Sequence, residues 1–257
     1  MRLQTLPSQR HAFTLVELLA VIGVIAVLIA IVLPMLGSSM ERARAFKCQM
    51  SQRTVAFDFR LFADNQLHGD RGNDNGRSSF ALETFQENQY GVDEFWRWGD
   101  DASAHQTPDD QGNDPMRCPS VSEPIILRKN VACSNGAVGP PQFISYGFNA
   151  RLNRAEIIDS FGRPVAKPVR LKPSIMQHAN VPLLLDVDGS RAFQLGVSPI
   201  FTAPSLNSLG PYANDRLWFP SSRHNGQTNV AFIDGHVESS ADPANEPDWR
   251  WDFQPTR

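Results

Sequence analysis

The chain has 257 residues, of which 41% are hydrophobic and 20% are charged, and its formal net charge is −3. This length and composition predict one membrane anchor and one globular domain of medium size. The small net charge and the lack of a basic block argue against nucleic-acid binding. The 19 prolines and 17 glycines favour a loop-rich β domain.

The first predicted element is an apolar run from Phe13 to Leu33, which is long enough to span a bilayer as a helix. Only Thr14 and Glu17 interrupt it, and a carboxylate in such a run costs about 2.5–3.5 kcal/mol unless it is neutralised. A buried core helix disagrees with the position of the run near the N-terminus, and a secretory signal peptide disagrees with its length and its acid. A plain membrane anchor leaves Glu17 unexplained.

The segment from Arg10 to Ile22, R-H-A-F-T-L-V-E-L-L-A-V-I, resembles the N-termini of type IV prepilins and type II secretion pseudopilins. The resemblance implies that prepilin peptidase cuts between Ala12 and Phe13 and that the new amino terminus is methylated. Ala12 stands where the family usually has glycine. Pro34 aligns with the family's proline that loosens the helix.

The same resemblance implies a partner for Glu17, namely the Phe13 ammonium group of a neighbouring subunit during filament assembly. From the residues alone, Glu17 can instead be protonated or extend toward the interface. Basic residues lie on both sides of the run and do not fix its orientation. The resemblance implies a single-pass protein of the inner membrane whose C-terminal domain lies outside the cytoplasm, in the periplasm or at the cell surface.

Beyond Pro34 the helix is expected to resume with an amphipathic stripe. The stripe consists of Phe46, Met50, Phe57 and Leu61, with Thr54 on the same face. We expect the soluble domain to pack on this stripe, in preference to a coiled coil with a partner, because the pattern lasts only about three heptads. Glycines at 69 and 72 are expected to end the helix.

These boundaries divide the chain into a leader at 1–12, a transmembrane helix at 13–36, an amphipathic continuation at 37–66 and a globular domain at 67–257. The expected fold class is α+β and pilin-like, with the long kinked helix packed on a mainly antiparallel β domain. The loop from Asp70 to Gly76 is expected to be solvated, with a calcium site as the weaker alternative. The aromatic-rich segment at 80–101 leaves helix and strand open, and 100–115 is expected to be an exposed loop.

Three cysteines are present. If the domain lies outside the cytoplasm, Cys118 and Cys133 can form a disulfide that stabilises the fold by about 3 kcal/mol. Their spacing is not that of a zinc site, so we expect no metal and no cofactor. Cys48 is left over on the helix, either buried near the membrane or available for intermolecular pairing.

Strands are expected at 143–149 and 181–187, followed by a loop rich in proline and serine at 198–212. Asp186, Asp188 and Gly189 close the second strand, where an Asx turn is favoured over a catalytic pair of acids. Residues 229–238 predict a hairpin, with Asp234 and Gly235 in a tight type I′ turn.

His224, nine intervening residues and then Asp234-Gly235 resemble the C-terminal H-X9-DG motif of bacterial pseudopilin-like proteins that carry the domain of unknown function DUF1559. The segments R-C-P-S at 117–120 and S-Y-G-F-N at 145–149 resemble the same family. A strand between His224 and Asp234 would hold them roughly 20 Å apart, which favours structural roles over a catalytic dyad. His236 is expected to be a cross-strand neighbour.

No phosphate-binding loop, G-x-S-x-G or H-E-x-x-H motif is present, so we expect no enzyme. The expected function is a membrane-anchored, prepilin-like subunit that prepilin peptidase processes. It would assemble with itself and other pilin-like subunits into a pseudopilus or a type II secretion-like filament. The alternatives are a membrane-tethered binding protein that does not assemble, and a surface enzyme.

Overall fold

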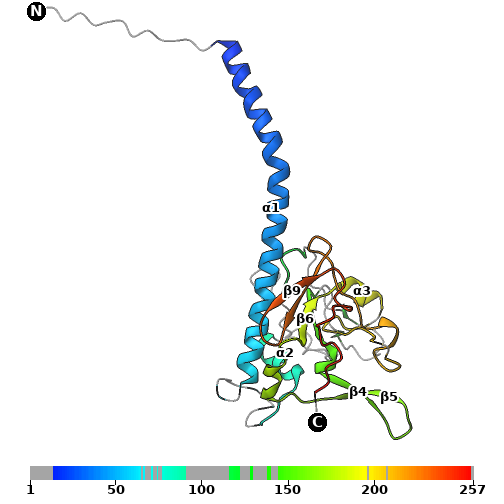
Figure 1. Ribbon diagram of the computed structural model, residues 1–257. Coiled ribbons are helices and arrows are strands. Elements are labelled where there is room, and N and C mark those ends of the chain that lie inside the picture. The colour runs from blue at the N-terminus through cyan, green and yellow to red at the C-terminus, as the bar shows by residue number, and fades with distance from the viewer. Residues whose placement is uncertain are drawn as a thin grey trace, which may run out of the picture. The chain divides into compact units, whose positions relative to one another are not determined.

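The computed structural model describes residues 14–64, 66, 71, 74, 77–90, 116–121, 128–129, 138–139, 144–195, 197–206 and 208–255. The chain forms two compact units, Met1–Ala43 and Arg44–Arg257. The helix α1, Leu15–Ala63, contributes its first part to one unit and its last part to the other, and it continues through Pro34 (Figure 1).

The second unit is built on a five-stranded sheet in the order β7-β3-β6-β8-β9. Its strands are β7 (Phe201–Thr202), β3 (Tyr146–Asn149), β6 (Pro182–Asp186), β8 (Thr228–Phe232) and β9 (Val237–Ser240). Only the pair of β3 and β7 is parallel within this sheet. The expected pilin-like α+β class, a long helix packed on a mostly antiparallel sheet, is confirmed.

Smaller elements surround the sheet. Two-stranded sheets pair β1 (Arg128–Lys129) with β2 (Val138–Gly139), and β4 (Arg154–Ile158) with β5 (Pro164–Pro168). The helices are α2 (Leu82–Tyr90), α3 (Gly189–Gln194) and the 3-10 turns η3 (Ala150–Leu152), η4 (Pro173–Gln177) and η5 (Ala213–Asp215). For the segment at 80–101, the sequence did not decide between helix and strand, and the structure shows that residues 82–90 form the helix α2. Residues 91–115 lie outside the described residues.

Hydrophobic clusters cover both faces of the sheet. Successive side chains of β8 point to opposite faces and therefore enter different clusters. Ala231 points into the cluster that α1 completes, whereas Val230 and Phe232 pack with Phe219 and Trp251 on the opposite face. All five residues of β6 are buried, as expected for a central strand.

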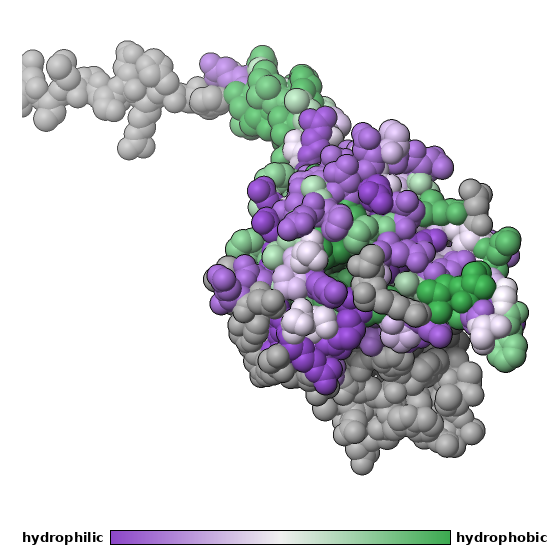
Figure 2. All heavy atoms as spheres, turned by 60° about the horizontal axis from the view of Figure 1, so that its bottom comes forward, coloured by the Kyte–Doolittle hydropathy of each residue, from purple (hydrophilic) through white to green (hydrophobic). Residues whose placement is uncertain are grey.

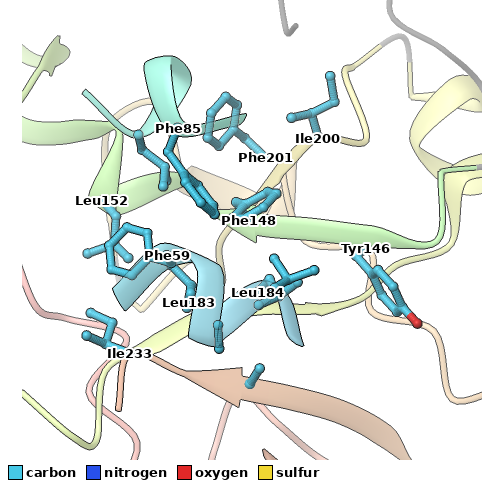
Figure 3. Packing of buried hydrophobic residues seen from close by; sticks show 14 of the residues in the cluster. Phe59, Phe85, Tyr146, Phe148, Leu152, Leu183, Leu184, Ile200, Phe201 and Ile233 are labelled. Carbon is cyan, nitrogen blue, oxygen red and sulfur yellow. The ribbon is translucent and has the colours of Figure 1, made fainter. Parts of the chain in front are cut away.

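Phe59 of α1 lies at the centre of the larger cluster, together with Phe85 of α2 and Phe148 of β3 (Figure 3). Its ring meets those of Phe85 and Phe80 edge to face, with centroid distances of 5.3 and 5.8 Å. Phe148 meets Phe85 in the same way at 6.2 Å. These contacts fix the last turns of α1 against the sheet.

The helix face that packs differs from the predicted stripe. Phe46 and Phe57 are 63% and 56% exposed, and Met50 and Leu61 are exposed as well. The buried face consists of Cys48, Gln52, Val55, Ala56, Phe59, Phe62 and Ala63. Two of these residues make polar contacts with the sheet, because Gln52 donates to the Asn229 carbonyl and Cys48 contacts Asp186. The prediction from apolar spacing alone therefore chose the wrong face of α1 as the one that packs on the domain.

The C-terminus of α1 also departs from the expectation. The helix ends at Ala63, before the glycines that were predicted to terminate it. Arg71 caps it, since its Nε and Nη2 donate to the Phe62 carbonyl at 2.9 and 2.6 Å. Arg71 is fully buried and Asp74 is 2% exposed, so the predicted solvated loop is wrong at these two residues. Asp74 is held there by the Arg170 guanidinium and the Ala81 N–H.

The predicted hairpin of β8 and β9 is confirmed, but its turn type is not I′. Gly235 has a φ of +94°, whereas Asp234 does not have the positive φ that a I′ turn requires at both positions. The Gly235 N–H donates to the Phe232 carbonyl, and the Phe232 N–H donates to the His236 carbonyl. This is the three-residue form, in which the glycine follows a tight turn as a bulge.

Candidate functional site

The first candidate region is the anchor part of α1. By length and composition α1 is able to cross a membrane, and the apolar window that qualifies it is not buried by other described residues. Leu15, Val16 and Leu33 are each more than 60% exposed. Figure 2 shows the same segment as a continuous apolar surface, unlike the mixed face of the domain. A helix that is apolar all round needs lipid or other helices as its surroundings.

Glu17 has a local role that the sequence reasoning missed. Its Oε2 accepts hydrogen bonds from the Thr14 backbone N–H and hydroxyl, both at 2.9 Å, and the Thr14 hydroxyl accepts from the Glu17 N–H at 3.3 Å. This is a capping box, for which T-x-x-E is the sequence signal. Ala12 and Phe13, the predicted processing site, lie outside the described residues.

The exposed stripe borders a groove of about 490 Å³ on the domain. One wall is α1, with Phe46, Met50 and Phe57, and the other is the turn between β8 and β9. Arg60 joins the walls by donating to the Asp234 carbonyl at 2.8 Å. The Asp234-Gly235 pair of the predicted motif therefore lies against α1.

His236 lines the same groove and behaves as a structural residue. Its ring stacks on Phe232 at 4.2 Å, and its Nδ1 lies 2.5 Å from Asp234 Oδ1. Asp188, another predicted candidate, caps α3, because its Oδ1 accepts from the N–H groups of Ser190 and Arg191.

The second candidate region is a buried cluster of Cys48, Cys118, Asp186 and His224. Cys48 comes from α1, Cys118 from the R-C-P-S segment, Asp186 from the end of β6 and His224 from the loop before β8. All four side chains are at most 4% exposed. Their thiol, imidazole and carboxylate atoms all lie within 4.8 Å of one another.

Short contacts join these four side chains. Cys48 Sγ lies 3.2 Å from Asp186 Oδ1, Asp186 Oδ2 lies 3.6 Å from His224 Nε2, and His224 Nε2 lies 3.4 Å from Cys118 Sγ. Tyr146 extends the group. In Figure 3 its hydroxyl points away from the aromatic cluster, and that oxygen lies 3.2 Å from Cys48 Sγ.

Burial and neighbouring groups shift the pKa values of the cluster. The hydrogen bond with Cys48, assisted by His224 and Arg223, lowers the pKa of the Cys118 thiol to about 4. Burial raises the pKa of the Cys48 thiol, and it raises the pKa of Asp186 to about 6 although the Arg223 charge acts against this. Cys118 is thus the group that most readily carries a negative sulfur.

Asp186 is also anchored from outside the cluster. The Asn229 N–H donates to its Oδ2 at 3.0 Å, and Arg223 Nη1 lies 3.5 Å from its Oδ1. Arg223 in turn donates to the carbonyls of Ser145 and Val187. The carboxylate is therefore fixed in one orientation toward the cysteines and His224.

The arrangement is not that of a cysteine-histidine-aspartate triad. In a triad the nucleophile and the acid bind opposite nitrogens of the imidazole. Here Cys118 and Asp186 both face Nε2 of His224, and Nδ1 has no hydrogen-bond partner among the described residues. Because both groups face the same nitrogen, the imidazole is not placed to relay a proton between them.

Sequence reasoning named all four residues separately but did not predict that they lie together. No local spacing signal exists, because the four residues come from four separate segments. His224 and Asp234 lie before and after β8. The predicted disulfide between Cys118 and Cys133 stays a prediction, because Cys133 lies outside the described residues.

Comparison with known proteins gives one match. No curated protein and no solved structure matches the chain. Residues 7–33 match the prokaryotic N-terminal methylation motif. The match covers the second half of the predicted leader, the predicted cut and the whole apolar run. Together with the apolar helix, the motif implies a pilin-like subunit that prepilin peptidase processes and that a single membrane-spanning helix anchors.

Proposed function

We propose that the protein is an assembling subunit of a pseudopilus or type II secretion-like filament in the cell envelope. Its partners are prepilin peptidase, copies of itself and other pilin-like subunits. The domain lies outside the cytoplasm, and the mature chain begins at Phe13. The methylation motif supports the processing, and the exposed apolar stripe on α1 supports the assembly.

The stripe is the observation that carries this proposal. Phe46, Met50 and Phe57 are large apolar side chains on the domain part of α1, yet 42–63% of each is exposed. A contiguous apolar patch on a folded domain marks an interaction surface. The adjoining groove carries Arg53 and Arg60, so a partner surface that is apolar with an acidic rim would fit it.

Glu17 would change partners during assembly. In the chain before processing its carboxylate caps the helix through Thr14. Cleavage after Ala12 creates a positive ammonium group on Phe13, four residues before Glu17. We propose that the Phe13 ammonium of a neighbouring subunit neutralises Glu17 in the filament, because an ionised carboxylate in hydrocarbon is stable only when paired.

We further propose that the domain is of the DUF1559 type with an H-X9-DG motif, and that the protein is not an enzyme. The positions of Asp234 and Gly235 in a turn against α1, and of His224 in the buried cluster, support structural roles for the motif. The runner-up function is a membrane-tethered binding protein that does not assemble.

Site-specific photocrosslinking in native membranes tests assembly. A crosslinking residue is placed at Phe46 or Phe57 in the full-length chain, and the matched control carries it at Phe161, which is 80% exposed in the turn between β4 and β5. We expect dimers and higher oligomers from positions 46 and 57 but not from 161. The absence of self-crosslinks at native expression would refute assembly and leave the tethered binding protein.

Mass spectrometry of the native N-terminal peptide tests processing separately. We expect a peptide that begins at Phe13 and carries an added methyl group. A start at Met1 would indicate an unprocessed anchor, and a start near Met40 would indicate a cleaved signal peptide. Either of these results would contradict the proposal.

A further inference from the structure

We infer that Cys48, Cys118, Asp186 and His224 form a structural zinc site inside the domain. The inference does not rest on the proposed function, because all four ligands belong to one chain. Two thiolates, one imidazole and one carboxylate are a ligand set that suits Zn²⁺, a borderline-soft ion with no redox chemistry.

The geometry fits a tetrahedral ion. With Zn–S bonds of about 2.3 Å and Zn–N or Zn–O bonds of about 2.0–2.2 Å, the edges of a tetrahedral site are roughly 3.4–3.8 Å long. The contacts of Cys118 with His224 Nε2 and of His224 Nε2 with Asp186 Oδ2 measure 3.4 and 3.6 Å, and Cys48 approaches the other carboxylate oxygen, Oδ1, to 3.2 Å. The remaining pairs lie within 4.8 Å, so small side-chain movements close the coordination sphere.

The charges around the site balance when zinc is bound. Two thiolates and one carboxylate around Zn²⁺ leave one net negative charge, and the Arg223 guanidinium beside Asp186 compensates it. Second-shell groups of this kind orient metal ligands. The Asn229 N–H orients Asp186, and the Tyr146 hydroxyl contacts the Cys48 sulfur.

The position of the site indicates what the ion would do. It would join the buried face of α1 to the end of β6, to the R-C-P-S segment and to the loop before β8. Four protein ligands leave no open position, which is typical of structural and not catalytic zinc. His224 would then serve as a metal ligand of the domain, whereas Asp234 and Gly235 form the turn at the other end of β8.

Metal analysis of the full-length chain tests this inference. The protein is purified in detergent without chelators from cells grown with zinc, and its zinc content is measured by mass spectrometry. We expect about one zinc ion per chain, as for a closed four-ligand site. Cys118→Ser should lose the zinc, and the matched control Cys133→Ser should retain it.

Cobalt substitution keeps the test valid if Cys118→Ser fails to fold. Tetrahedral Co²⁺ with two thiolates gives intense sulfur-to-metal charge-transfer absorption. Cys118→His replaces one thiolate with another zinc ligand, so this variant should still bind one ion while the charge-transfer absorption falls to about half.

Three results would overturn the zinc site. One is a wild-type protein that contains no zinc and shows a disulfide between Cys48 and Cys118, or between Cys118 and Cys133, in peptide mass spectrometry. Another is unchanged zinc content in Cys118→Ser. The last is loss of zinc in Cys133→Ser, which would assign the ion to a different set of ligands.

Discussion

Two phenylalanines on nearly opposite faces of α1, Phe57 and Phe59, should respond in opposite ways to truncation. Phe59→Ala should strongly destabilise the domain, whereas Phe57→Ala should leave its stability nearly unchanged and weaken self-association instead. The reason is their environment, because Phe59 is fully buried and Phe57 is 56% exposed. The pair is matched in residue type, helix and distance from the anchor.

The expected magnitude for Phe59→Ala follows from its packing. Truncation of a buried phenylalanine costs about 3–5 kcal/mol, and the cost is highest where the site cannot collapse. Phe59 also loses its edge-to-face contacts with Phe80 and Phe85, which contribute about 0.5–1.5 kcal/mol per pair beyond burial. We therefore expect the upper end of this range, about 4–5 kcal/mol. A surface change such as Phe57→Ala should stay within about 0.5 kcal/mol.

Urea unfolding of both full-length variants in the same detergent, followed by tryptophan fluorescence, measures the difference. Crosslinking in native membranes then measures self-association, for which we expect fewer oligomers with Phe57→Ala than with the wild type. Equal destabilisation by the two substitutions would show that the assigned helix face is wrong. A stable Phe57→Ala variant with undiminished oligomers would remove the stripe from the assembly surface.

Three further substitutions test local features of the domain by urea unfolding. The hydrogen bond from Arg170 and that from the Ala81 N–H outweigh burial and hold the pKa of Asp74 below its ordinary value of 3.8. Arg170→Met should therefore cost about 1.5–3 kcal/mol at neutral pH. Because a lowered carboxyl pKa stabilises the fold above the unfolded value, this cost should shrink as the pH falls below 3.8. A cost that does not change with pH would indicate lost packing instead. Gly147→Ala should cost about 1–3 kcal/mol, because its Cβ would lie 2.6 Å from Val187 Cγ1, and an unchanged urea midpoint would mean that β3 shifts freely. Gly235→Ala should cost about 1–2 kcal/mol, since its φ is +94°; unchanged stability would show that the turn adopts another form.

Local patterns in the sequence determined the anchor, the long helix and the hairpin. The apolar run at 13–33 is informative by itself because the thickness of a bilayer sets its length. The β8 and β9 hairpin follows from alternating residues around Asp234-Gly235, although the choice between turn types depended on the backbone of Ile233 and Asp234. The capping box of Thr14 and Glu17 is also a local signal, because the pattern T-x-x-E is visible in the sequence. It was not predicted, because Glu17 was interpreted as an assembly residue.

Tertiary structure decided the features that depend on residues far apart in the chain. Residues at helical spacing occur on more than one face of α1, and the packing of Phe59 against Phe80 and Phe85 decided which face is buried. The segment from Asp70 to Gly76 is rich in charge and glycine, which predicts a solvated loop. Arg71 is nevertheless buried, because its guanidinium donates to the Phe62 carbonyl at the end of α1.

The buried cluster is the clearest case of this kind. Cys48 and Asp186 lie 138 positions apart, and Cys118 and His224 lie 106 apart, so no spacing rule for a local metal motif applies to them. The four side chains supply two thiols, an imidazole and a carboxylate, which are evident from the residue types alone. The packing of α1 on the sheet brought these positions together, because the helix face that is buried carries Cys48 to the end of β6.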